Sequence, residues 1–122
     1  MSKLTFKEFA KINRARCESD DGFCQPLTLW SKSDWVTAVT GELGEAANIV
    51  KKLNRVRDGI PGNTESADGL NASLLDELAD VFIYLDLMIQ SEGESLAAIV
   101  AAKFNRTSKE LGFPHRVPQR SE

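Results

Sequence analysis

Cysteine, histidine and aromatic residues are scarce in this chain of 122 residues. It has two cysteines and one histidine, and aromatic side chains make up 7% of the residues. Cys17 and Cys24 are too few for a disulfide framework and form no C-x-x-C pair, so neither a zinc site nor thiol exchange is indicated. The single imidazole, His115, excludes any site that needs two histidines from one chain.

Excess positive charge and long hydrophobic runs are also missing. Fifteen Lys and Arg residues against eighteen Asp and Glu residues give a net charge of −3, so we expect no binding to a nucleic-acid polymer. Hydrophobic residues at 42% and charged residues at 27% are an ordinary globular balance, and we expect no membrane span. The N-terminus turns polar at Ser2 and Lys3, unlike a signal peptide, so we expect a cytoplasmic protein.

Helix signals dominate the chain, and strand alternation is nearly absent. We therefore predict an all-α fold, with residues 1–122 forming a single helical domain. Ser31 or Ser33 can cap the second helix, because their hydroxyl groups accept unpaired backbone N–H groups. The expected helices cover residues 4–18, about 33–54, 70–91 and 95–111.

Two segments between and after these helices are predicted to be irregular. The connection over about 55–69 contains Gly59, Pro61 and Gly62, and its length is typical of a mobile functional flap. Gly112 and Pro114 end the last helix, so residues 112–122 are expected to form an irregular tail.

Four carboxylates have unusual positions on the two middle helices. At about 100° of rotation per residue, Glu42 and Glu77 fall inside the apolar stripes of their helices. Glu45 and Asp80 follow three residues later, so each pair shares one helix face. If the two faces meet, four acidic side chains converge on one place.

Converging carboxylates cannot all stay ionised in an apolar setting without compensation. A divalent cation resolves the conflict, and oxygen ligands without cysteine or histidine favour Mg²⁺, with Mn²⁺ as the second choice. The alternative is that the acids pair with basic side chains on an ordinary bundle, namely Lys51, Lys52, Lys103 or Arg106. A di-iron bundle is disfavoured because its Glu-x-x-His motifs are missing.

The acids and their neighbours resemble the MazG-like all-α nucleoside triphosphate pyrophosphohydrolases, which are related to dimeric dUTPases and dCTP pyrophosphatases. The family's E-x-x-E motif is matched by residues 42–45, and its E-x-x-D motif by residues 77–80. Residues 103–106, with the sequence KFNR, are similar to a segment with lysine and asparagine in that family. The resemblance covers most of the chain, from about 35 to 111. Gly41 departs from it, because many relatives have a glutamate there.

This resemblance implies a four-helix MazG-like bundle that hydrolyses a nucleoside triphosphate to the monophosphate and pyrophosphate with Mg²⁺. It implies catalytic and metal-binding roles for four acids, which are Glu42, Glu45, Glu77 and Asp80. The alternative is a metal- or nucleotide-binding helical interaction module without catalysis.

Three further residues are candidates for substrate contacts. Lys103 falls on the inward face of its helix, where it can meet a phosphate or pair with an acid of the third helix. Asn105 projects away from Lys103 and can serve a neighbouring site. Tyr84 lies one turn beyond Asp80 and can donate its hydroxyl to a phosphate or pack in the core.

The third helix is apolar nearly all round, with Leu75 and Phe82 outside the stripe that contains the acids. A four-helix monomer cannot cover both sides of such a helix. We therefore expect a homodimer or a homotetramer, which the family resemblance also implies.

Overall fold

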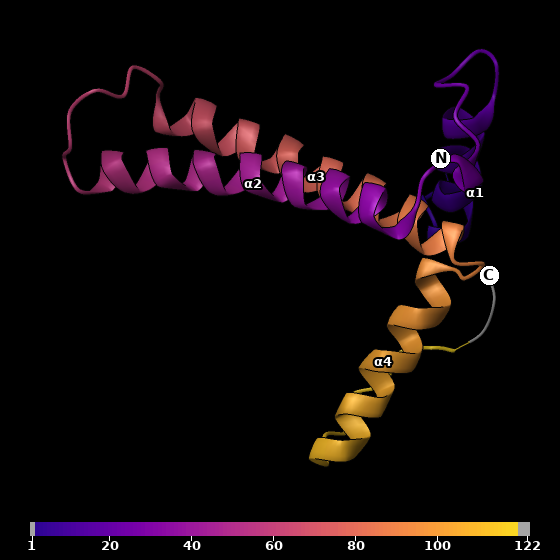
Figure 1. Ribbon diagram of the computed structural model, residues 1–122. Helices are drawn as coiled ribbons and strands as arrows, with labels where there is room; N and C mark the ends of the chain where they lie inside the picture. Colours follow the sequence, from indigo (N-terminus) through magenta and orange to yellow (C-terminus); the bar gives the residue numbers. More distant parts are fainter. Residues whose placement is uncertain (1, 120–122) are drawn as a thin grey trace. The chain divides into compact units, whose positions relative to one another are not determined.

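The structure is a computed structural model that describes residues 2–119. It contains four α-helices and one short 3-10 helix, with no strand in the described residues, so the predicted all-α class is confirmed. Figure 1 shows the helices in chain order. Their bounds are α1 Phe6–Glu18, η1 Leu27–Leu29, α2 Lys32–Arg57, α3 Ala67–Ser91 and α4 Leu96–Leu111.

Serine and threonine side chains fix the helix starts. Ser31 caps α2 in a reciprocal capping box: its hydroxyl accepts from the backbone N–H of Asp34, whose carboxylate accepts from the backbone N–H of Ser31. Ser95 caps α4 by accepting from the N–H of Ala98. Thr5 does the same for α1, which therefore begins two residues later than predicted.

The connection between the middle helices is shorter than the sequence predicted. α2 continues to Arg57 and α3 already begins at Ala67, so the irregular segment is 58–66 and not 55–69. Gly69 lies in the first turn of α3, where its N–H donates to the hydroxyl of Ser66 at 3.1 Å. The residues at 120–122 of the predicted tail lie outside the described residues.

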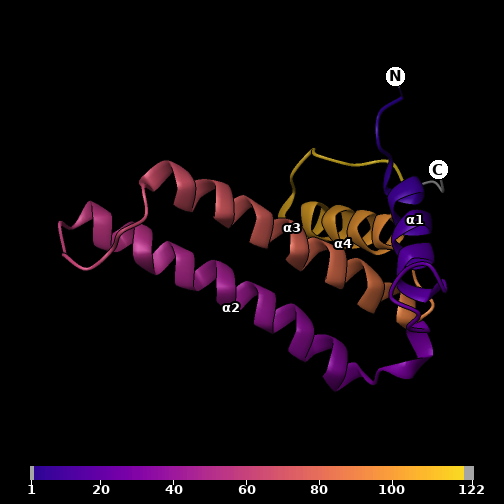
Figure 2. The same cartoon turned by 90° about the horizontal axis from the view of Figure 1, so that it is seen from above.

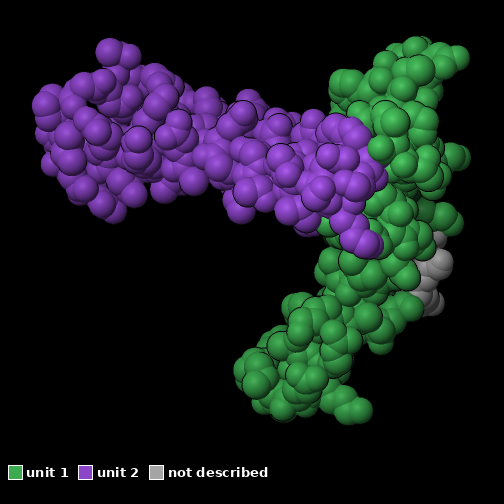
Figure 3. All heavy atoms as spheres, in the orientation of Figure 1, with its two compact units in different colours: residues 1–29, 86–122 green, residues 30–85 purple. Residues whose placement is uncertain are grey.

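The chain divides into two compact units, which Figure 3 shows in different colours. Residues 30–85 form one unit, in which α2 and most of α3 run antiparallel and side by side (Figures 1 and 2). Trp35 and Leu70 are fully buried, and Trp30 contacts Trp35 edge to face with 4.7 Å between ring centroids.

The other unit comprises residues 1–29 and 86–122, with α1, the end of α3 and α4. Its buried positions include Cys17, Leu27 and Leu96. Two buried polar side chains join α1 to the end of α3, because Nδ2 of Asn13 donates to Oδ2 of Asp86 at 2.9 Å. No helix among the described residues combines the length and the apolar character that a membrane crossing requires.

Candidate functional site

Three acids from two helices lie together in the unit of residues 30–85. One carboxylate oxygen from each of Glu42, Glu45 and Glu77 lies within 4.8 Å of the other two. The i, i+3 spacing places Glu42 and Glu45 on one face of α2. α3 runs antiparallel to α2 (Figures 1 and 2), and the carboxyl group of Glu77 on α3 lies near that face. These residues are named the acid cluster below.

Asp80, the fourth predicted acid, is exposed and is not a member of this tight group. Its negative charge nevertheless acts on the cluster, because it contributes to the raised pKa of Glu42. The structure thus brings three of the four predicted acids within ligand distance of one another, with Asp80 as a further charge beside them.

Crowding of the carboxyl groups changes their acidity. Burial raises the pKa of Glu42, and the charges of Glu45 and Asp80 raise it further, against a smaller lowering by a hydrogen bond with Glu77. Hydrogen bonding with Glu45 and with Glu42 raises the pKa of Glu77 to about 7 from an ordinary value of 4.5. Glu42 and Glu77 therefore hold protons more tightly than exposed glutamates do.

The acids of the cluster have no basic partner within their own unit. Among the described residues of 30–85, no Lys or Arg forms an ion pair with Glu42, Glu45 or Glu77, and Lys52 pairs instead with Glu65 at 2.9 Å. The alternative in which Lys52 neutralises the acids does not match this arrangement.

Two carboxylate oxygens of the acid cluster also lack a hydrogen-bond partner among the described residues. Oε2 of Glu42 and Oε2 of Glu77 are buried and accept no hydrogen bond from a donor among the described residues. Buried polar atoms are normally paired with protein, water or an ion. Partnerless carboxylate oxygens from two helices suit a hard cation such as Mg²⁺, which takes oxygen ligands. The residues present therefore fit the predicted metal.

Tyr84 belongs to the same unit and lies on α3. Its ring is stacked on that of Trp30, with 6.5 Å between centroids and 11° between planes, and the residue is half-buried. The ring thus lies in an aromatic group with Trp30 and Trp35.

Lys103 and Asn105 lie on α4, in the other unit. Lys103 was predicted to lie on the inward face of its helix but is exposed, as is Val100, whereas Leu96 on the same face is buried. The amide of Asn105 is already engaged, because Nδ2 donates to the carbonyl of Val117 and Oδ1 accepts from its N–H, both at 2.8 Å.

Sequence reasoning missed one buried acid. Asp86 is completely buried and accepts from Asn13 and from Gln90. The signal was present, since Asp86 interrupts the apolar run of residues 81–89, but its partner Asn13 is 73 residues away and no local pattern links them.

Comparison of the chain with protein-family models, with curated proteins and with solved structures gives no match. The MazG-like resemblance therefore depends on the motif residues alone.

Proposed function

We propose that this protein is a Mg²⁺-dependent hydrolase that cleaves a nucleoside triphosphate to the monophosphate and pyrophosphate. The observation that carries the proposal is the acid cluster: three carboxylates from two helices, within 4.8 Å of one another and without a basic partner in their unit. Such a group is costly unless protons or a cation neutralise it. The motif resemblance suggests the reaction, and the acids of the cluster are the side chains that would hold the ion.

In this proposal Glu42, Glu45 and Glu77 hold the ion, and Asp80 adds negative charge beside them. When bound, Mg²⁺ would offset the charge of the phosphates and acidify a water molecule. Mn²⁺ would be an acceptable substitute because it takes the same oxygen ligands.

A carboxylate oxygen of the cluster would accept the proton of the attacking water. The water oxygen forms a bond to the α phosphorus, the bond from that phosphorus to the bridging oxygen breaks, and pyrophosphate leaves. Lys103, Asn105 and Tyr84 stay proposed substrate contacts.

A panel of triphosphates tests the activity. Purified protein with Mg²⁺ should release both pyrophosphate and a monophosphate from at least one canonical, deoxy or modified nucleoside triphosphate. Glu42→Gln and Glu77→Gln should each lower kcat about 100-fold or more, since general base and electrostatic contributions are of that size. Asp76→Asn is the matched control, because Asp76 is the exposed neighbour of Glu77 outside the cluster.

If no triphosphate of the panel is hydrolysed while metal or nucleotide binding is retained, the alternative of a non-catalytic binding module is favoured. An equal decrease of kcat in Asp76→Asn and in Glu77→Gln would contradict a specific role for the acid cluster.

We also propose that the protein is a homo-oligomer. Val36, Leu43 and Val50 repeat at seven-residue intervals on α2 and are 48%, 52% and 40% exposed. On α3, Leu75 and Leu78 are likewise exposed. A seven-residue apolar repeat is typical of helices that pack against other helices, and a second copy of the hairpin would cover both stripes.

Light scattering tests this assembly. The wild-type protein should have the mass of a dimer or a tetramer, and Leu43→Glu should shift it toward the monomer. Lys51→Glu, an exposed charge change on the same helix, is the control that should leave the mass unchanged. A wild-type monomer at all concentrations would contradict the proposal.

A further inference from the structure

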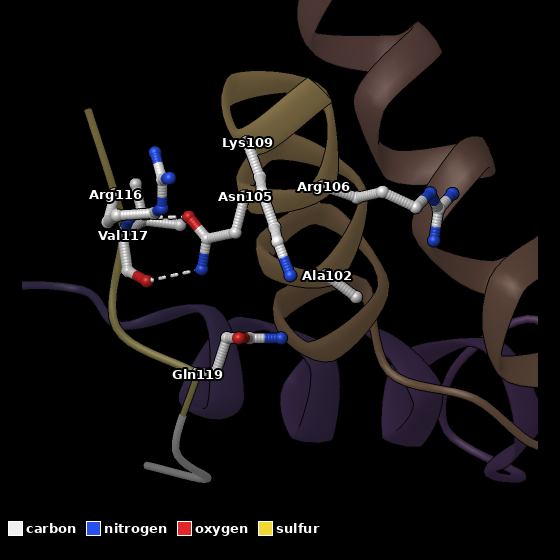
Figure 4. A pocket seen from close by; sticks show the side chains of 7 residues that line it. All are labelled: Ala102, Asn105, Arg106, Lys109, Arg116, Val117 and Gln119. Carbon is white, nitrogen blue, oxygen red and sulfur yellow. Dashed lines mark hydrogen bonds between the residues drawn. The ribbon is translucent and has the colours of Figure 1, made fainter. Parts of the chain in front are cut away.

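A basic pocket lies between α4 and the segment that follows it, within the unit of residues 1–29 and 86–122 (Figure 4). Its volume is about 670 Å³, within the range of small-molecule sites. Ala102, Asn105 and Lys109 lie on one face of the helix, and Arg116 and Gln119 come from the following segment. The acid cluster belongs to the other unit.

The backbone builds this pocket by turning the chain back on α4. Gly112 ends the helix in the left-handed region, with φ of 74°, and the N–H of Phe113 donates to the carbonyl of Ser108 at 2.8 Å. The two hydrogen bonds between Asn105 and Val117 then hold the segment beside the helix (Figure 4). Asn105 is thus a positioning residue that holds the segment after α4 in place as the second wall of the pocket, with α4 as the first.

The lining of the pocket has charge of one sign only. Arg106, Lys109 and Arg116 contribute three positive charges, and none of the lining residues is acidic. Among the described residues, no carboxylate forms an ion pair with any of the three. Because the whole chain has a net charge of −3, this local excess does not follow from the composition.

The basic side chains of the pocket point away from one another, as like charges do when no anion lies between them. Figure 4 shows the guanidinium groups of Arg106 and Arg116 extending in opposite directions, with the Lys109 side chain between them. Arg116 is held by its Nη1, which donates to the carbonyls of Phe113 and His115 at 2.6 and 2.9 Å. Its other N–H groups form no hydrogen bond among the described residues.

We propose that this pocket binds the phosphate group of a small molecule, with Lys109 and Arg116 as the charged contacts and the amide of Gln119 as a donor. Guanidinium groups match phosphate oxygens in pairs, and lysine adds a point charge. The inference does not depend on the proposed hydrolysis, because its charged contacts, Lys109 and Arg116, have no role in that proposal.

Amide NMR spectra of the ¹⁵N-labelled protein test the proposal. The titration is done with EDTA present, so that no divalent ion can bring phosphate to the acid cluster. Inorganic phosphate, pyrophosphate and AMP are added at constant ionic strength, with adenosine and chloride as controls. Saturable shifts at Gly112, Val117 and the side-chain amide of Asn105 are expected with the three phosphates and not with the controls. Tighter binding of AMP than of phosphate would identify a nucleotide as the source.

Variants distinguish phosphate binding in this pocket from nonspecific attraction of phosphate to any positive charge of the protein. Lys109→Gln and Arg116→Gln should each weaken phosphate binding about threefold, and together about tenfold, as expected for partly exposed ion pairs. Lys3→Gln with Lys7→Gln removes the same charge elsewhere and should leave the affinity unchanged. Asn105→Ala keeps every charge but releases the second wall, so it should also weaken binding. Absence of saturable shifts, equal loss in the control pair, or full affinity in Asn105→Ala would each overturn the proposal.

Discussion

Replacing Asp86 by alanine should destabilise the protein strongly, because its carboxyl group is completely buried. Oδ2 accepts a hydrogen bond from Nδ2 of Asn13 and another from Nε2 of Gln90, both at 2.9 Å, while Oδ1 has no partner among the described residues. Gln90 also donates to the carbonyl of Ala10 at 3.0 Å. Asp86 is therefore the acceptor that joins α1 to the end of α3.

The size of the effect follows from these contacts. Asp86→Ala removes the acceptor of one N–H of Asn13 and of one N–H of Gln90, at about 1–3 kcal/mol for each lost buried hydrogen bond. With the cavity that forms, the expected loss in the free energy of unfolding is at least about 3 kcal/mol. Asp86→Asn keeps the shape and one acceptor oxygen, so it should stay within about 1 kcal/mol of the wild type.

Chemical denaturation followed by circular dichroism measures both values. Asp76→Ala is the control, since exposed substitutions usually change stability by less than about 0.5 kcal/mol. A double-mutant cycle of Asn13→Ala with Asp86→Ala should give a coupling energy of about 1–2 kcal/mol. The reasoning is refuted if Asp86→Ala costs no more than Asp76→Ala, or if the coupling energy is zero.

Three other predictions concern the acid cluster and the backbone. Without divalent ions, the free energy of unfolding should fall as pH rises from about 4.5 through 7. The reason is that folded Glu77, with a pKa of about 7, holds its proton more tightly than unfolded Glu77. Chemical denaturation measured across that pH range should show a weaker pH dependence for Glu77→Gln. Ser31→Ala removes the cap of α2 and should cost about 1 kcal/mol by the same assay, and an unchanged value would contradict the role of the cap. Gly22→Ala would place a Cβ 2.0 Å from the carbonyl oxygen of Arg16 and should therefore lower Tm. Gly41→Ala adds a Cβ that meets open space on a helix and should raise Tm. Tm changes of the same sign in the two variants would contradict this reasoning.

The helices were predictable because their signals are local. Ser31, Ser95 and Gly112 act within a few residues of themselves, and each marks a helix end as its chemistry predicts. The start of α3 was missed because Gly69 was interpreted as part of a loop. In the first turn of a helix a glycine is tolerated, and the hydroxyl of Ser66 supports its N–H.

The acid cluster was predictable only in part. The i, i+3 spacing predicted which acids share a face, and the meeting of Glu42, Glu45 and Glu77 follows from two such faces. The exposed position of Asp80 depends on how α3 is rotated against α2, which spacing alone does not define. The hydrogen bonds of Asn105 with Val117 join a helix to an irregular segment, and no periodic pattern predicts such a pair.

Binding of Mn²⁺ measured by electron paramagnetic resonance tests the central claim most directly, because the signal of free Mn²⁺ decreases as the ion binds. The wild-type protein should bind Mn²⁺ saturably, and Mg²⁺ should displace it. Glu42→Gln with Glu77→Gln should abolish this binding, while Asp76→Asn should preserve it. Absence of saturable binding in the wild type, or full binding in the double variant, would contradict the claim that the acid cluster holds a divalent cation.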